Sequence, residues 1–361
     1  IDDLAEIANI DAIEREDGQV DVLINGEQLV TATRYRELET LRDTTIDPDR
    51  PDFLSVYFVD TGTQLNITSG ELYGATHMRD VELANAADRI DEIARALIQS
   101  INDTHTQGNG LEYLEGVVRA TTKVEDPTAA LDTPDLLPFE IQDGSFDITV
   151  FDSSGTAVGT TPVSITTGAT SLNDLAASIN GVANLSASVT IDGELEVTAA
   201  PGFSFALSND TSGVLNAVAL HSFFGGKDAL SIAVNPYLVE NPGAITSGTS
   251  LDPLETGDNT AALAMAALRN QAVLAEETQT INEFFEATVV QVGIRTRANN
   301  DILELERSFA RDLSRRKQEQ SGVNLDEEVT TLLVHQRAFE ASARVVSVAD
   351  RMLETLVSVV R

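Results

Sequence analysis

"GVNLDEEVTTLLVHQRAFEASARVVSVADRMLETLVSVVR" (residues 322–361) closes the chain, and its apolar spacing predicts one uninterrupted amphipathic helix. Asn324 is a suitable N-cap, and Glu327 three residues later completes a pattern typical of a capping box. Asp326, Glu327 and Glu328 complement the positive end of the helix dipole. The stretch therefore predicts a helix with a well-defined start that continues to the last residues of the chain.

The apolar residues of this helix form two neighbouring stripes. The first follows a 3-4 spacing without a slip, with Gln336 and Asp350 as its two polar positions: Val329, Leu332, Gln336, Phe339, Ala343, Val346, Asp350, Leu353, Val357 and Val360. The second lies beside it: Val345, Ala349, Met352, Leu356 and Val359. One stripe suits one partner helix, whereas two stripes need two, and leaving four Leu or Val side chains exposed would forgo on the order of 6 kcal/mol. We therefore predict an assembly interface formed by Val329, Leu332, Phe339, Ala343, Val346, Met352, Leu353, Leu356, Val357 and Val360.

The net charge of the chain is −35, from 23 basic and 58 acidic residues among 361. Such a charge argues against nucleic acid or an anionic membrane surface as partner. The charge is unevenly placed, because residues 293–361 hold 11 basic and 11 acidic residues while the preceding part carries the whole excess. The final helix is therefore a different kind of surface from the rest of the molecule.

The length of the chain predicts two or three domains. There is no cysteine, which excludes disulfides, zinc–thiolate sites and thiol catalysis. No run of about 18 apolar residues predicts a membrane span. The chain opens at Ile1, without Met, inside a helix predicted from the spacing of Ile1, Leu4 and Ile7. We expect that a further N-terminal portion precedes it.

Residues 1–123 are predicted to combine strands with a long helix. Asp17-Gly18 lies between two strand-like runs and predicts a hairpin with a type I′ turn. A second strand pair is expected at residues 53–59 and 64–67. A helix follows whose narrow seam is expected to pack inside the molecule: Leu83, Ala87, Ile90, Ala94, Leu97 and Ile101.

Residues 124–226 contain no Lys or Arg, which marks a separate domain. Alternation of Phe146, Ile148 and Val150 with polar neighbours predicts a strand. Ser171 is a suitable N-cap for a short helix. Asp192-Gly193 predicts another hairpin, in which two pairs of residues face each other: Val189 and Ile191 against Leu195 and Val197.

These patterns together predict an α+β multidomain protein. Long, coiled-coil-like helical segments come from both ends of the chain, and a β-rich domain is inserted between them. Beyond a Pro- and Gly-rich linker, helices are expected at residues 261–271 and 280–317. The predicted parts are residues 1–123 (first part of the core domain), 124–235 (inserted domain), 236–317 (linker and helical return) and 318–361 (terminal helix).

Signatures of catalysis and ligand binding are sparse. The histidines, His77, His105, His221 and His335, are far apart in sequence and lack metal-binding spacing. No nucleophile elbow, phosphate-binding loop or dinucleotide fingerprint occurs. A glycosidase-type carboxylate pair stays open, because acidic residues are numerous, but no spacing selects one. We expect no catalytic residue, no cofactor and no metal.

Basic residues recur along the predicted helix at 280–317. They include Arg295, Arg297, Arg311, Arg315, Arg316 and Lys317. One interpretation is a solvated face with i,i+4 ion pairs. The other is a contact of complementary charge with acidic neighbouring subunits, and the sequence leaves both open.

Three segments of the final helix resemble the C-terminal end of the bacterial flagellar axial proteins, the rod, hook and hook-associated family: "GVNLDEEVTTLL" (322–333), "QRAFEASARVV" (336–346) and "ADRMLETL" (349–356). "NLDEE" (324–328) and "ITSGELYGATHMRD" (67–80) are similar to the hook-associated protein 1 (FlgK) family within that group. Residues 171–200 resemble the hook IN motif of flagellins and hook-associated proteins. The chain departs mildly at Phe339, where members usually carry Tyr, and at Arg337, where they often carry Gln.

The resemblance implies a non-enzymatic structural subunit of the flagellum, at the junction of hook and filament. Residues 318–361 would be a D0-like axial helix, residues 1–123 part of a D1-like core, and residues 124–235 a D2-like outer domain. The implied partners are other copies in a ring, the hook protein, the next hook-associated protein or filament side, and an export chaperone. The implied location is extracellular, after passage through the flagellar secretion apparatus.

Two alternatives remain at this point. One is another axial protein, either hook protein or a flagellin, which shares the terminal helix. The other is a secreted acidic glycan-binding or glycan-cleaving protein that uses the strand-rich insert.

Overall fold

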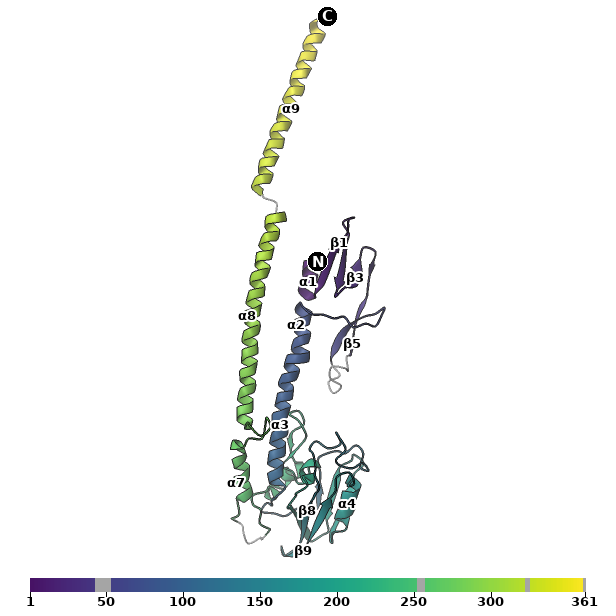
Figure 1. Cartoon of the computed structure of the whole chain (residues 1–361), viewed down its shortest axis with the longest axis vertical. Coiled ribbons are helices and arrows are strands. Elements are labelled where there is room, and N and C mark those ends of the chain that lie inside the picture. Colours follow the sequence, from purple (N-terminus) through teal and green to yellow (C-terminus); the bar gives the residue numbers. More distant parts are fainter. Residues whose placement is uncertain (43–52, 252–256, 322–324, 360–361) are drawn as a thin grey trace. The chain divides into compact units, whose positions relative to one another are not determined.

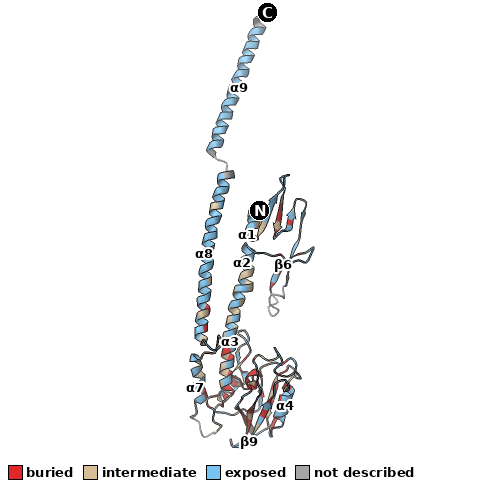
Figure 2. Ribbon diagram, in the orientation of Figure 1, coloured by how far each residue is buried: buried red, intermediate tan, exposed pale blue. Residues whose placement is uncertain are grey.

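The computed structural model describes residues 1–42, 53–251, 257–321 and 325–359 (Figure 1). The chain contains both helices and strands and divides into two compact units, Ile1–Thr288 and Val289–Arg361. Most buried residues belong to the first unit (Figure 2). Within the described ranges, no helix is both long enough and apolar enough to span a membrane.

The first unit begins with a short helix and a four-stranded antiparallel sheet: α1 (Asp2–Ile7), β1 (Ile10–Glu14), β2 (Val20–Ile24), β3 (Glu27–Thr31) and β4 (Arg34–Tyr35). The predicted hairpin at Asp17-Gly18 is confirmed, with Glu14 opposite Val20. Its turn is not type I′, because only Gly18 has a positive φ, of 78°. The amide of Gly18 instead donates to the carbonyl of Arg15, so a four-residue turn ends in a left-handed glycine.

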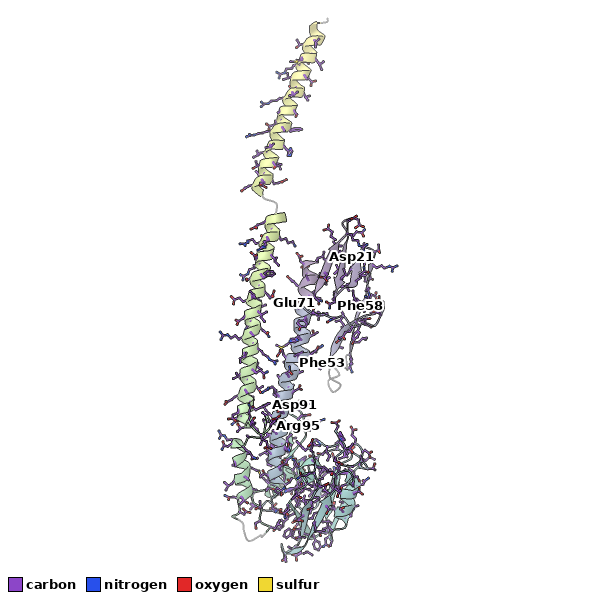
Figure 3. The ribbon with its side chains drawn as sticks, viewed as in Figure 1. Asp21, Phe53, Phe58, Glu71, Asp91 and Arg95 are labelled. Atoms are coloured by element: carbon purple, nitrogen blue, oxygen red, sulfur yellow. The ribbon has the colours of Figure 1, made fainter. Side chains whose placement is uncertain are left out.

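A separate two-stranded ribbon follows, formed by β5 (Leu38–Arg42) and β6 (Leu54–Phe58). The predicted strand at 53–59 is confirmed as β6. Its predicted partner at 64–67 is confirmed only as one bridge, Gln64 opposite Tyr57, on the edge of β6 that β5 leaves free. Phe58 on β6 is fully buried and Phe53 just before it is buried as well (Figure 3).

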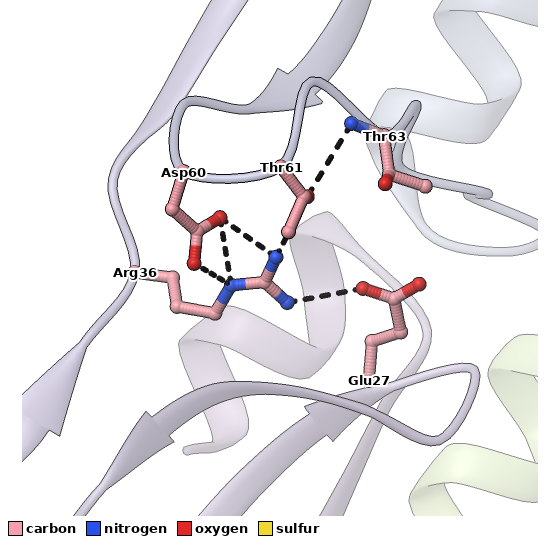
Figure 4. Close-up of polar contacts among 5 residues, drawn as sticks. All are labelled: Glu27, Arg36, Asp60, Thr61 and Thr63. Atoms are coloured by element: carbon pink, nitrogen blue, oxygen red, sulfur yellow. Dashed lines mark hydrogen bonds and ion pairs between the residues drawn. The ribbon is translucent and has the colours of Figure 1, made fainter.

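Arg36 connects this ribbon to the four-stranded sheet. Its guanidinium group donates to both oxygens of the Asp60 carboxylate and to Glu27 (Figure 4). The same group lies over the Phe58 ring, 3.6 Å from its centroid. The Asp60 carboxyl has its pKa lowered, chiefly by the hydrogen bonds from Arg36. Arg36 thus contacts β3, β6 and the loop after β6.

A continuous helical segment leads out of the sheet: α2 (Glu71–His77), a π-helical stretch η1 (Met78–Leu83), and α3 (Ala84–His105). The predicted helix is confirmed, but its seam is only partly buried. Leu83 and Ile90 are exposed, whereas Ala94 and Ile98 are buried. Ile98 lies outside the predicted seam, because the buried face near the end of α3 turns toward Phe139 and Ala217 of the β-rich part.

The β-rich part contains two three-stranded antiparallel sheets, ordered β10-β11-β7 and β12-β8-β9. Their strands and the associated helices are β7 (Val117–Arg119), β8 (Gly144–Asp152), β9 (Ala157–Ile165), α4 (Leu172–Asn180), β10 (Leu185–Val189), β11 (Leu195–Ala199), β12 (Phe203–Ser208) and α5 (Val214–Ala217). The largest hydrophobic core of the described chain lies here. It includes Leu114 and Val118 from before residue 124, and Leu238 from after residue 235.

Local predictions hold well in this part. Phe146, Ile148 and Val150 are buried on β8. Ser171 caps α4 and forms a capping box with Asp174. The hairpin at Asp192-Gly193 is confirmed, with Val189 opposite Leu195. The predicted position of Ile191 is wrong: β10 ends at Val189, so Ile191 lies in the turn and is fully exposed.

The return segment of the first unit runs over the β-rich core: β13 (Phe224–Gly225), β14 (Ala233–Val234), α6 (Pro236–Glu240), η2 (Pro242–Ala244), α7 (Thr260–Ala267) and η3 (Leu268–Asn270). The helix predicted at 261–271 is confirmed as α7 and η3. Two long helices complete the chain, α8 (Ile281–Ser321) and α9 (Leu325–Val359), which confirms the helices predicted there.

A left-handed turn precedes α8. Three consecutive residues that are not glycine, Ala275, Glu276 and Glu277, have φ values of 50°, 56° and 61°. The turn is closed by the amides of Thr278 and Gln279, which both donate to the carbonyl of Leu274. A left-handed residue with a side chain costs roughly 1–2 kcal/mol, so this turn is strained.

Replacing Glu276 with glycine is therefore expected to stabilise the protein. Relief of the left-handed strain exceeds the greater freedom of glycine in the unfolded chain, so we expect a gain of about 0.5–1 kcal/mol. The control is Glu286→Gly, which lies in right-handed α8 and should cost about 1 kcal/mol. Denaturant unfolding followed by circular dichroism measures both. A loss of stability in Glu276→Gly would contradict the left-handed assignment.

Candidate functional site

The surface predicted to assemble lies on α9. The sequence forms a helix here because Leu, Ala, Glu and Arg are frequent and neither Gly nor Pro interrupts it. Asp326, Glu327 and Glu328 occupy its first turn, as expected. The helix begins at Leu325, directly after the predicted N-cap Asn324, which lies outside the described residues.

The predicted interface residues are exposed wherever their side chains are described. Val329, Leu332, Phe339, Val346, Met352, Leu353 and Leu356 are 55–76% exposed, and Ala343 is exposed too. Figure 2 shows that α9 is exposed along its described length. The side chain of Val357 and all of Val360 lie outside the described residues. Exposure of this many apolar side chains is costly, at roughly 1.5–3 kcal/mol for each one that burial would cover.

The exposed side chains of α9 divide into three faces, because successive helical residues are about 100° apart around the axis. One face carries the 3-4 stripe with Leu332, Phe339 and Leu353. The second carries Val345, Met352 and Leu356, which are also exposed. The third carries charges of both signs: Arg337, Glu340, Arg344, Arg351 and Glu354. Such a charged face is typical of a surface that stays in water. The helix can therefore bury its two apolar faces while the charged face remains exposed to solvent.

Helix α8 carries a further exposed apolar surface. Ile302, Leu305, Phe309 and Leu313 follow one face of the helix and are 50–67% exposed. Their 3-4-4 spacing is the signal that could have identified them. They extend the exposed apolar surface of the second unit from α9 to α8.

The basic residues of α8 are paired only in part. Asp312 accepts hydrogen bonds from Arg315 at 2.7 Å and from Arg316 at 2.9 Å. Arg315 also lies 3.9 Å from Glu319. The Nε of Arg311 donates to the carbonyl of Arg307 rather than to a carboxylate. Local i,i+3 and i,i+4 pairs therefore account for Arg315 and Arg316, whereas Arg311 bonds to a backbone carbonyl instead.

Two of the histidines meet inside the first unit, which sequence reasoning missed because they are 116 residues apart. The rings of His105 and His221 lie 4.8 Å apart, and both residues are buried. Nδ1 of His105 lies 2.9 Å from the carbonyl of His221, and its Nε2 accepts the amide of Thr246 at 3.1 Å. These bonds join the end of α3 to two later segments. No group of three or more potential metal ligands occurs among the residues that the structure describes.

Acid is expected to destabilise the first unit through His105. Burial lowers the pKa of His105 to about 4, whereas an unfolded histidine has a pKa near 6.5. The unfolded chain therefore binds the proton first, and stability is lost as the pH falls from about 6.5 to about 4, by on the order of 3 kcal/mol. Denaturant unfolding at several pH values measures this slope.

The variant His105→Gln, which cannot take up this proton, supplies the control. Its slope of stability against pH between pH 4 and 6.5 should be smaller than that of the unsubstituted protein. A flat stability profile of the unsubstituted protein across that window would show that His105 does not remain neutral in the folded state.

Two family models match the chain. The flagellar hook-associated protein FlgK helical domain matches residues 1–117. The C-terminal domain of the flagellar basal body rod proteins FlgEFG matches residues 317–359, which include all of α9. The second match thus coincides with the exposed apolar helix.

Curated relatives match over nearly the whole chain. Flagellar hook-associated protein 1 of Salmonella typhimurium is 25% identical over 99% of this chain and 63% of the relative. The Escherichia coli protein of the same name is 23% identical over 99% of this chain and 62% of the relative. The chain thus spans less than two thirds of the length of these relatives.

A solved structure is also similar, the flagellar hook junction protein FlgK from Burkholderia pseudomallei. It shares 11% identity, with 88% of this chain and 76% of that chain covered and a TM-score of 0.44. A likeness at that score does not establish a shared fold.

Proposed function

We propose that the chain is a member of the FlgK family and a structural subunit of the junction between flagellar hook and filament. The FlgK helical domain matches residues 1–117, and hook-associated protein 1 relatives match over 99% of the chain. The proposed subunit assembles through its terminal helix and carries no catalytic role. A ring of copies would couple two polymers of different stiffness.

The observation that carries this proposal is the exposed double stripe of α9. A lone helix with two apolar faces gains most by packing between at least two neighbours. The match to the axial-protein C-terminal domain covers this same helix. The assembly residues are those predicted above, from Val329 to Val360.

The proposed organisation follows the predicted parts. Residues 318–361 form the D0-like axial helix, and residues 1–123 with 236–317 form the D1-like core. Residues 124–235 form the D2-like outer domain. Coiled-coil-like helices from both ends of the chain surround the axis, and the acidic β-rich domain projects outward. The near-neutral charge of the second unit suits close packing of many copies.

The proposed partners lie on both sides of the ring. They are the hook protein on one side, and the next hook-associated protein or the filament on the other. An export chaperone would hold the exposed apolar helix before secretion, and the mature location would be extracellular.

Immunogold electron microscopy tests the proposal, with antibody raised against residues 124–226 and cells of the source organism. Label confined to the point where hook meets filament is expected. Label spread along the hook or the filament would favour hook protein or flagellin instead. Absence of flagellar label would reopen a secreted glycan-binding or glycan-cleaving role. Cells that lack the coding gene are the control for antibody specificity.

A further inference from the structure

The two units differ strongly in net charge. Residues 1–288 hold 12 basic and 47 acidic residues, whereas residues 289–361 hold 11 of each. Copies of the first unit therefore repel one another, and this repulsion is strongest at low ionic strength. Any close assembly of copies needs positive charge placed against this acidic surface.

One face of α8 carries such charge. Arg307, Arg311 and Arg315 are spaced by four residues and are exposed, so they form a continuous line along the helix, here called the arginine stripe. With about 100° between successive residues, Arg311 lies on the opposite side of the helix from Ile302 and Phe309. The helix therefore presents an apolar face on one side and the arginine stripe on the other.

The arginine stripe is only partly neutralised by its own helix. Arg315 is paired with Asp312 and lies 3.9 Å from Glu319, but no ion pair of Arg307 or Arg311 with a carboxylate occurs among the described residues. Like charges at i,i+4 weaken an isolated helix. Arginine also favours planar, two-pronged contacts with carboxylates. These features fit a contact surface better than a solvated one.

We propose that the arginine stripe docks on the carboxylate-rich first unit of a second copy of this chain. The proposal rests on the proposed assembly and adds the electrostatic contact that lets acidic subunits pack together. In this arrangement the apolar face of α8 remains available to pack against other helices, while the arginine stripe contacts the first unit of a neighbouring copy.

Isotope-resolved crosslinking tests the contact in the full chain. The variant Arg307→Lys/Arg311→Lys/Arg315→Lys keeps the charge and supplies amines. It is prepared in ¹⁴N and ¹⁵N forms, mixed, and treated with a carbodiimide, which joins an amine to a carboxylate in direct contact. We expect mixed-isotope amide links between the stripe and residues 1–288. The matched control places lysines at Arg337, Arg344 and Arg351 of α9, and few such links are expected there.

Sedimentation velocity of the variant Arg307→Glu/Arg311→Glu/Arg315→Glu provides the second readout. We expect its association to be at least tenfold weaker than that of the unsubstituted chain at 50 mM salt, with the difference largely lost at 500 mM. Equal association of both proteins at 50 mM salt would overturn the stripe contact alone. If every crosslink joins two segments of the same isotope, the stripe contacts the first unit of its own copy, and the proposed contact between copies is overturned. A chain that stays monomeric under all conditions would overturn the proposed assembly and the stripe contact together.

Discussion

Replacing both Phe339 and Leu353 with aspartate is expected to abolish incorporation into the flagellum. Both side chains lie on the 3-4 stripe of α9 and are 76% and 60% exposed. Within an assembled helical interface each aspartate would have to be buried without a partner, at a cost of several kcal/mol per charge. Loss of the two apolar side chains adds roughly 2 kcal/mol each. Complementation of a deletion strain, scored by filament length and swimming, measures the effect.

The matched control adds the same two charges to another face of α9. Thr330→Asp/Thr355→Asp lies nearly opposite the stripe and should assemble normally. Both double variants should leave the first unit folded, since its cores contain no residue of α9. Thermal unfolding of the purified proteins checks that point. Normal filaments with Phe339→Asp/Leu353→Asp would show that the stripe is not the assembly face.

Replacing Gly193 with alanine is expected to unfold much of the β-rich part. Gly193 has a φ of +79°, and a Cβ added to it would lie 2.1 Å from the carbonyl oxygen of Val124. The amide of Val124 donates to the carbonyl of Gly193 at 3.0 Å, so the two backbones cannot separate without losing that bond. Left-handed strain, backbone overlap and the lost bond together amount to on the order of 4 kcal/mol.

Gly155→Ala is the control, because Gly155 has nearly the same φ, +78°, with no atom within 4 Å of an added Cβ. It should cost only the left-handed strain, about 1–2 kcal/mol. Denaturant unfolding followed by circular dichroism compares the two. Equal losses for both variants would mean that Val124 does not approach Gly193 as closely as described.

Local sequence rules predicted the parts of the fold that neighbouring residues decide. The capping of α4 by Ser171 and the burial of Phe146 and Ile148 needed only propensity and alternation. The apolar stripe of α9 was predicted from helical spacing alone, because which residues share a face of one helix depends only on their positions along it. Its role in assembly stays a prediction, since contact with another copy lies outside a single chain.

Several errors lie where residues distant in sequence compete. Gln64 makes only one bridge to β6, whose main partner is β5, some 22 residues earlier. The seam of α3 was misplaced because its buried face is set by Phe139 and Ala217. The meeting of His105 with His221 depends on the packing of three separate segments. Spacing along one helix or strand contains no information on such contacts.

The absence of Lys and Arg from residues 124–226 has a consequence for proteolysis. Trypsin cuts only after those residues, and Lys123 and Lys227 on either side of the gap are both exposed. Digestion of the folded protein would therefore leave residues 124–227 as one uncut piece. The piece would stay attached even so, because β11 keeps its backbone ladder to β7 on the other side of the first cut. Outside a cell, the domain would resist trypsin-like proteases by lacking the residues that they recognise.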